Sequence, residues 1–421
     1  MQRRVVITGL GAIAPNGIGK ELFWDACLSG RSGIRQITHF DASSLPSQIA
    51  GEVINFEPAA LGLTPDECQN LDRNTQFALA AANLALQDAA FPEKLSIAER
   101  ESMGVYIGSG VNILGEIEKL WLQTMGQGSS TLHKSGNDSQ PPMRRLMTHA
   151  SSAAIAIHHQ LHGPCMTLST ACSSGADAIG QAFWTIQKER ADRMLAGGTD
   201  APINLITLTS CSILGTLSTH NHPAAQASCP YDQNRDGFVM AEGAGIVLLE
   251  EREAALARNA HIYAELIAFA SNNNGYHMTA LPTNGVPLKQ LLLQALEEAQ
   301  LQPEDLGYIN SHGSSTRLND MTETIAYKSA FGEQAYRLPI SATKSLIGHS
   351  QGAASALETI VTSLVLEHQI IPPTINLEHP DPLCDLDYVP NNARQATVKA
   401  ALTHSSGFGG VNSALVLVRQ D

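Results

Sequence analysis

The strongest constraint on the fold is a segment that occurs twice, a Gly-rich turn leading into an apolar strand. It is AEGAGIVLLEE at residues 241–251 and GFGGVNSALVLV at residues 407–418. Each copy ends a series of predicted strands and helices. A repeated supersecondary pattern of this kind indicates two similar structural units that pack together. We therefore expect an α/β protein with two halves, an N-terminal half at 1–255 and a C-terminal half at 256–421.

The composition is typical of a compact enzyme with an acidic surface. Of the 421 residues, 43% are hydrophobic and 16% are charged, and the formal net charge is −14. Such a surface repels phosphate backbones, so we expect no nucleic-acid partner. We find no apolar run long enough to span a membrane and no signal-peptide pattern at the start, and we expect a cytoplasmic protein. Seven cysteines without a CxxC pair argue against a disulfide scaffold or a zinc ribbon.

Hydrophobic patterns place the secondary structure coarsely. We expect a strand over Val5–Thr8 that ends in a Gly-rich turn, a helix over Thr75–Ala90 and a loop over Gly126–Pro142.

The segment TGLGAIAPNG lacks GxGxxG, so it does not predict a dinucleotide site. His158 and His162 have zinc-ligand spacing but no HExxH glutamate, and we expect no metal there.

The strongest chemical signal is LSTACSSGADAIG, in which a strand ends at Thr170 and a helix begins near Ser173. Cys172 therefore lies at a turn where backbone N–H groups and the helix dipole favour negative charge, which predicts a lowered thiol pKa. Small neighbours leave room for a substrate. This pattern favours a nucleophilic cysteine. A buried cysteine that packs like alanine is the structural alternative.

Two further loops carry histidines. An apolar strand should end at His312, where a side chain is placed for acid–base chemistry, or it simply lies in a surface turn. Lys344 and His349 lie five residues apart ahead of a helix of small residues. A nearby lysine disfavours protonation of an imidazole, and a neutral imidazole can accept from a thiol or donate to a carbonyl oxygen. A surface lysine and a capping histidine are the alternative.

The fourth signal is SSGFGGVNS, a loop in which glycines flank Phe408. Its backbone N–H groups could face a developing oxyanion. It could equally be a plain turn with Phe408 in the core.

Together, these motifs resemble one family from Val5 to Val418. TACSSG, NSHGSST, KSLIGHSQGA and GFGGVN occur in the order found in β-ketoacyl-ACP synthases, which have a thiolase-like fold. The resemblance implies two α/β halves in a layered αβαβα arrangement. Within the family, TRLNDMTETIAYK is most similar to the ketosynthase subunit of bacterial type II polyketide synthases. Asn319 stands there where fatty-acid elongating synthases usually carry glycine.

The resemblance implies a role for each matching residue. Cys172 would accept an acyl chain from an acyl carrier protein. His312 and His349 would support decarboxylation of malonyl-ACP, and the resulting carbanion equivalent would attack the thioester. Lys344 would tune the histidines. The remaining assignments are an oxyanion hole of the Cys172 and Phe408 N–H groups, a gate at Phe408 with Gly407 and Gly409, and a tether at Glu323. No cofactor and no metal are implied.

The chain departs from the elongating synthases near the gate and at the expected carrier surface. Thr403, His404, Ser405 and Ser406 precede GFGG where relatives usually have Asn-Ser-Phe. The segment TPDECQNLDRN is acidic where relatives often carry lysines for the carrier protein. Only Arg73 remains there, so we expect docking to use other residues, Arg144 and Arg145, or a partner subunit.

Four hypotheses follow. The first is a polyketide ketosynthase that forms a heterodimer with a chain-length-factor subunit, a relative without the cysteine. The second is a homodimeric fatty-acid elongating 3-oxoacyl-ACP synthase II with the same chemistry. A noncatalytic, chain-length-factor-like partner is disfavoured by the presence of Cys172. A thiolase is disfavoured because the GFGG loop lacks the second cysteine that thiolases carry.

Overall fold

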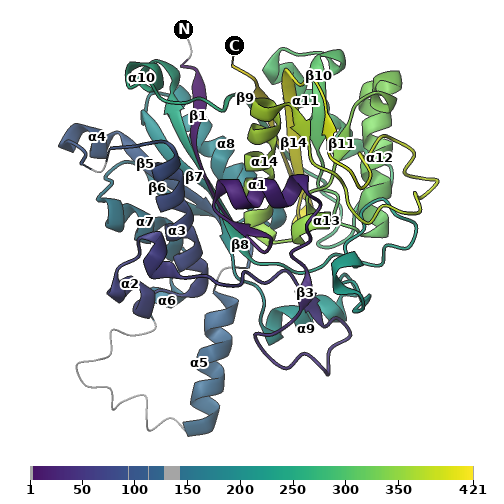
Figure 1. The fold of residues 1–421 in the computed structure, drawn as a ribbon, viewed down its shortest axis with the longest axis horizontal. Helices are drawn as coiled ribbons and strands as arrows, with labels where there is room; N and C mark the ends of the chain where they lie inside the picture. The colour runs from purple at the N-terminus through teal and green to yellow at the C-terminus, as the bar shows by residue number, and fades with distance from the viewer. Residues whose placement is uncertain (1–2, 93, 112, 128–142, 421) are drawn as a thin grey trace.

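The computed structural model describes residues 3–92, 94–111, 113–127 and 143–420. In this part of the chain one mixed sheet of eleven strands runs through the molecule (Figure 1). Its first half has the order β1-β8-β7-β5-β6, and its second half has the order β9-β15-β14-β10-β11. The two halves join where β1 and β9 pair antiparallel. The bounds in the first half are β1 Val5–Ala14, β8 Gly243–Glu251, β7 Arg193–Asp200, β5 Met103–Gly108 and β6 Cys165–Leu168. Those in the second are β9 Ala264–Asn273, β15 Val411–Val418, β14 Ala400–Ser406, β10 Leu306–Asn310 and β11 Ile340–Ser341.

The two halves of the sheet have the same pairing pattern. In each, the first strand is antiparallel to the second, the second to the third, and the last three strands are parallel. The short strand β2 (Gly17–Ile18) pairs antiparallel with the end of β1. The pairs β3–β4 (Arg35–Gln36, Ile49–Ala50) and β12–β13 (Ile370–Ile371, Arg394–Gln395) lie outside the main sheet. The expected pair of similar α/β halves is confirmed.

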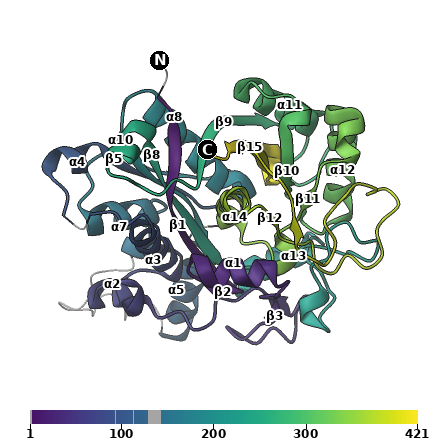
Figure 2. The same ribbon diagram turned by 45° about the horizontal axis from the view of Figure 1, so that its top comes forward.

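Helices form three further layers. The central helices α8 (Ser174–Gln187) and α14 (Ala354–His368) contact both halves of the sheet. Figure 2 shows α14 in the middle, with α3 (Arg73–Asp88) and α7 (Ala150–His159) on one side and α11 (Val286–Ala299) and α12 (Arg317–Phe331) on the other. This is the expected αβαβα layering. The other helices are α1 Lys20–Leu28, α2 Pro65–Asn70, α4 Ile97–Glu101, α5 Leu114–Gln127, α6 Met143–Leu146, α9 Leu205–Ile213, α10 Arg252–Ala257 and α13 Lys344–Ile347.

Each interface between layers has its own buried apolar cluster. The largest lies around the central helices and includes Ile179, Phe183, Leu357 and Leu364. A second packs α3 against β1, β5 and β8, and a third packs α11 and α12 against β9 and β15. Burial of apolar side chains on both faces explains why these strands are near-continuous apolar runs rather than alternating ones. In the described ranges, no helix is both long and apolar enough to cross a membrane.

The predicted turn after Thr8 is wrong, because β1 continues to Ala14. Gly9 and Gly11 lie within the strand where α3 crosses it. A Cβ at Gly9 would lie 2.2 Å from the Ala85 carbonyl oxygen, and one at Gly11 would lie 1.9 Å from the Ala81 oxygen. These glycines therefore allow close helix–strand contact rather than a turn. Most of the predicted loop at Gly126–Pro142 lies outside the described residues, and α5 extends through Gln127.

Candidate active site

Cys172 lies in a tight turn at the start of a central helix. β6 ends at Leu168, a short 3₁₀ turn spans Ala171–Ser173, and α8 begins at Ser174. Ala171 has a φ of 53°, in the left-handed region that an alanine rarely adopts. The Cys172 carbonyl oxygen accepts from two serine hydroxyls, Ser355 Oγ at 3.1 Å and Ser405 Oγ at 3.0 Å. The Cys172 turn is therefore held from α14 and from β14, both in the C-terminal half.

His349 contacts the thiol directly. Its Nε2 lies 3.0 Å from Cys172 Sγ, although the two residues are 177 positions apart in the chain. The backbone N–H of Gln351 donates to His349 Nδ1 at 3.2 Å, so Nδ1 accepts and a neutral ring carries its proton on Nε2. Of the two options left open by the sequence, this geometry disfavours acceptance from the thiol, because the Nε2 that faces sulfur carries the ring proton and is a donor.

His312 and Lys344 form a second pair beside the first. Lys344 Nζ lies 3.3 Å from His312 Nδ1 and donates to the His312 carbonyl oxygen at 2.8 Å. It also forms a buried ion pair with Glu358 on α14. An ammonium group has only donor hydrogens, so His312 Nδ1 accepts, and the ring proton is on Nε2. The expected lysine–histidine contact is made with His312. The Lys344 charge acts on His349 electrostatically, by lowering the pKa of its ring.

Burial dominates the electrostatics. It raises the pKa of the Cys172 thiol to about 11, and the Lys344 charge and the N–H groups of Phe408 and Cys172 offset only part of this shift. The predicted lowering of the thiol pKa is therefore wrong, because the dipole of a helix start is weaker than complete desolvation. Burial, with a smaller contribution from the Lys344 charge, holds the pKa of both His312 and His349 well below the usual value. Both rings are neutral at pH 7, as the sequence predicts for His349.

Glu323 lies behind the histidine loop on α12. It is 1% exposed and accepts hydrogen bonds from the Gly313 N–H at 3.1 Å, the Tyr231 hydroxyl at 2.7 Å and the Asn319 amide at 3.1 Å. Burial and the neighbouring Asp320 raise the Glu323 pKa to about 8. The Glu323 carboxyl thus contacts the backbone next to His312, which is the position expected of a tether.

The GFGG loop closes over the thiol turn between β14 and β15. Its Phe408–Gly410 portion is a 3₁₀ turn, and Gly409 has a φ of 79°, which glycine adopts without strain. A Cβ at Gly407 would lie 3.1 Å from the Cys172 backbone nitrogen. Glycine at 407 therefore lets the loop approach Cys172, with the Phe408 N–H directed at Sγ.

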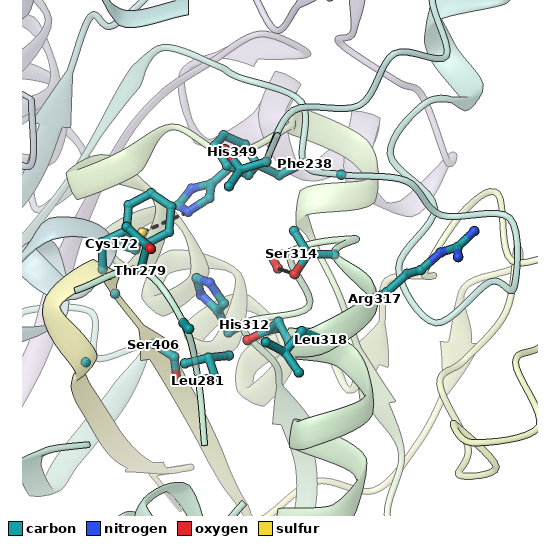
Figure 3. Close-up of a pocket in the computed structure, with 18 of the residues that line it drawn as sticks. Cys172, Phe238, Thr279, Leu281, His312, Ser314, Arg317, Leu318, His349 and Ser406 are labelled. Carbon is teal, nitrogen blue, oxygen red and sulfur yellow. Dashed lines mark hydrogen bonds between the residues drawn. The ribbon is translucent and has the colours of Figure 1, made fainter. Parts of the chain in front are cut away.

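A cavity of about 370 Å³ connects these groups to the surface. Cys172, His312, His349 and Phe408 line it, and Arg317 lies among the residues that line it toward solvent. Figure 3 shows Cys172 and His349 side by side, His312 pointing into the same space, and the Arg317 side chain well away from them. A buried thiol beside two neutral imidazoles at the end of a cavity can form a thioester and polarise a carbonyl oxygen.

Several residues of the site were missed by the sequence reasoning. Ser355 and Glu358 on α14 and Tyr231 contact the site residues and are buried. Glu358, an acidic residue among the small and apolar residues in the middle of α14, was the available signal. Gln351, two residues after His349, lines the cavity. In contrast, His158 is not among the residues that line this cavity and pairs with Glu67 at 2.8 Å.

Comparison with known proteins agrees with this geometry. The models of the N-terminal and C-terminal domains of β-ketoacyl synthases match residues 2–255 and 263–378. The tetracenomycin polyketide synthase ketoacyl synthase alpha subunit of Streptomyces glaucescens is 42% identical, covering 99% of this chain and 97% of the relative. The 3-oxoacyl-[acyl-carrier-protein] synthase 2 of Coxiella burnetii is 41% identical over 99% of each chain.

Solved structures give the same result. A type II polyketide synthase ketosynthase in complex with its acyl carrier protein, bound to the hexaketide, matches with a TM-score of 0.89 at 36% identity, covering 100% of both chains. The ishigamide ketosynthase/chain length factor matches with a TM-score of 0.89 at 33% identity and the same coverage. The chain therefore belongs to the β-ketoacyl synthase family. It is a condensing enzyme of the acyltransferase class with the thiolase-like fold.

Proposed function

We propose that this chain is the ketosynthase subunit of a type II polyketide synthase and extends acyl chains by decarboxylative Claisen condensation. The observation that carries the proposal is the 3.0 Å contact between Cys172 Sγ and His349 Nε2, in a cavity that His312 also lines. The alpha subunits among the relatives and the ketosynthase bound to a hexaketide support the polyketide assignment.

In the first step Cys172 takes the acyl chain from a carrier thioester. The Cys172 sulfur bonds to the acyl carbon, the carrier C–S bond breaks, and the thiol proton leaves with the carrier thiol. Negative charge develops on the carbonyl oxygen in between. The N–H groups of Cys172 and Phe408, which both act on the thiol, are the donors we assign to this oxyanion.

In the second step malonyl-ACP loses CO2. The electrons of the broken C–C bond move into an enolate, whose oxygen accepts from the Nε2–H groups of His312 and His349. The enolate carbon then attacks the Cys172 thioester, and Cys172 leaves as the thiolate. Lys344 keeps both rings neutral and holds His312 in the required tautomer, so Lys344 is a positioning residue here. Glu323 positions the His312 loop, and Phe408, between Gly407 and Gly409, acts as the gate.

We propose a second subunit on the face around β6 and α5. β6 lies at the edge of the sheet, where Met166 is 47% exposed. α5 projects from the body beside α9 (Figure 1), with Trp121 60% and Leu122 61% exposed. A sheet edge that has no pairing strand among the described residues is suited to a subunit interface, and so are exposed apolar side chains. The solved ketosynthase/chain length factor supports a heterodimer as the assembly.

Arg73 and the expected docking residue Arg145 are both engaged within the chain. Arg73 forms an ion pair with Glu242, at 2.6 Å, and Arg145 donates to the Asn70 carbonyl at 3.1 Å. The Arg144 side chain lies outside the described residues. Arg317 is exposed at the cavity and is our candidate for contact with the carrier protein or its phosphate-bearing arm.

The division of the chain into two halves at residues 255/256 is likewise our proposal, and the cytoplasmic location stays a prediction.

The test is intact-mass analysis of the purified chain, with and without co-expressed cysteine-less relatives from the same source. We expect acyl-ACP to load one acyl group, malonyl-ACP to extend it, and extension to require the second subunit. Cys172→Ala should remove loading, by at least about a thousandfold, yet retain malonyl decarboxylation. Cys211→Ser, in a half-buried residue on α9, is the matched control. Efficient extension of saturated chains by the homodimer would favour the fatty-acid synthase hypothesis instead.

A further inference from the structure

Gln351 places a side-chain amide next to the nucleophile. The residue is 6% exposed and lines the cavity with Cys172. Its Oε1 lies 3.9 Å from Cys172 Sγ, and its Nε2 lies 3.4 Å from the Met240 sulfur. Thiol and thioether sulfurs are weak hydrogen-bonding partners. A buried primary amide is therefore held close to the reacting atom without a strong hydrogen-bonding partner among the described residues. This arrangement is energetically unfavourable unless a ligand supplies the missing hydrogen bond.

The turn itself does not require an amide. Gln351 has a φ of 51°, and Ala171 has a φ of 53° in the corresponding turn before α8, with only a methyl side chain. The contact with the His349 ring comes from the Gln351 backbone N–H, which every residue except proline supplies. The side chain is thus available for a role of its own.

We infer that Gln351 is a specificity-determining residue, whose amide binds the oxygen at C3 of the acyl chain on Cys172 and favours 3-oxoacyl over saturated chains. This inference rests on the proposed function, in which Cys172 carries an acyl thioester. C3 is three bonds from the sulfur, within reach of an amide 3.9 Å from Sγ. Loading removes the thiol proton that Oε1 faces, and rotation of the amide then presents an N–H to the C3 oxygen.

A saturated chain offers no such acceptor and leaves the amide unpaired. A site built to hydrogen-bond an oxygen discriminates against the analogue that lacks it, because its own polar group then loses a partner. One neutral hydrogen bond in a buried site corresponds to about tenfold in rate or affinity. The product of each condensation is a 3-oxoacyl chain, so an unreduced chain that returns to Cys172 always carries this oxygen.

The experiment measures Cys172 acylation by intact mass, with 3-oxobutanoyl and butanoyl thioesters of the carrier protein as paired donors. We expect the wild type to load the 3-oxo chain about tenfold faster than the saturated one. Gln351→Leu and Gln351→Met keep the volume and remove the amide, and each should abolish this preference. Equal slowing of both donors, or an unchanged ratio in both variants, would overturn the assignment.

Two controls separate the possible failures. Loading by the butanoyl donor reports that a variant is folded, and agreement between the leucine and methionine variants excludes an effect of shape. If neither variant folds, the wild-type ratio decides, because equal loading of the two donors contradicts the role of Gln351. If neither donor loads Cys172 in the wild type, the proposed function fails as well, which is a different result from loading without preference.

Discussion

The two central helices, α8 and α14, follow turns with the same backbone conformation but different side chains. Before α8 the turn is Ala171-Cys172-Ser173, and before α14 it is Gln351-Gly352-Ala353. Each opens with a non-glycine residue in the left-handed region, at 53° and 51°. The second position carries the thiol in one turn and no side chain in the other. The repeat therefore supplies the geometry twice, and only one copy carries a thiol.

The second turn acts on the first. His349 and Gln351 reach Cys172 from the α14 side, and the Gly352 N–H donates to Asp200 at 2.7 Å, which ties the turn to β7 in the other half. Ser355 in α14 holds the Cys172 carbonyl. The difference teaches that one half supplies the thiol and the other supplies the groups that contact and hold it. Each prediction below tests one side of that division.

The largest expected effect concerns the thiol turn. Because the Cys172 pKa is raised to about 11, the thiolate is a minor form at neutral pH, and its fraction increases about tenfold per pH unit below the pKa. Alkylation of Cys172 by iodoacetamide should therefore accelerate about a thousandfold from pH 7 to pH 10. Peptide mass spectrometry measures the rate, with Cys172→Ser for the background. A plateau near pH 8 would show that the helix start outweighs burial after all.

The next effect concerns the histidines. Since both rings present Nε2–H, His349→Ala and His312→Ala should each lower malonyl decarboxylation by about 10²- to 10³-fold. A glutamine at 349 retains an N–H donor, so His349→Gln should recover at least about tenfold over the alanine variant. The half-exposed His261 provides the control, with His261→Ala at the wild-type rate. If glutamine is no better than alanine, His349 acts as a base rather than as a donor.

The third effect is on stability and concerns the second turn. A Cβ at Gly352 would lie 2.6 Å from the Gly110 nitrogen and 2.8 Å from an Asp200 carboxylate oxygen. Gly352→Ala should lower the free energy of unfolding by about 1–3 kcal/mol, as overpacking does. Chemical denaturation measures it. Gly115→Ala is the control, because its nearest neighbour is an Asn204 amide at 3.3 Å. Equal stability of the two variants would mean that the turn has room for a side chain.

How much the sequence could predict depends on how local each feature is. The strand–turn–helix pattern around Cys172 and the family motifs were sufficient to predict the fold. They also predicted which residues lie together around the cavity. Three features were not accessible in this way: the choice of His312 as the direct partner of Lys344, the sign of the Cys172 pKa shift and the uninterrupted β1. Each depends on a contact between distant segments, such as the α3 backbone at Gly9, or on complete burial, and neither follows from local residue patterns.

The smallest expected effect tests whether the shared backbone conformation is strained. A left-handed conformation costs a non-glycine residue about 1 kcal/mol, which a glycine at that position avoids. Glycine also has greater freedom in the unfolded chain, and this effect cancels part of the gain. Ala171→Gly should therefore raise the free energy of unfolding by up to about 1 kcal/mol. Gln351→Gly relieves the same strain but also removes the amide and its packing against Met240, so it should be less stable than Ala171→Gly. Denaturation of the two variants in parallel measures this difference. A loss of stability in Ala171→Gly would show that the two turns, although alike in φ, are not under the same strain.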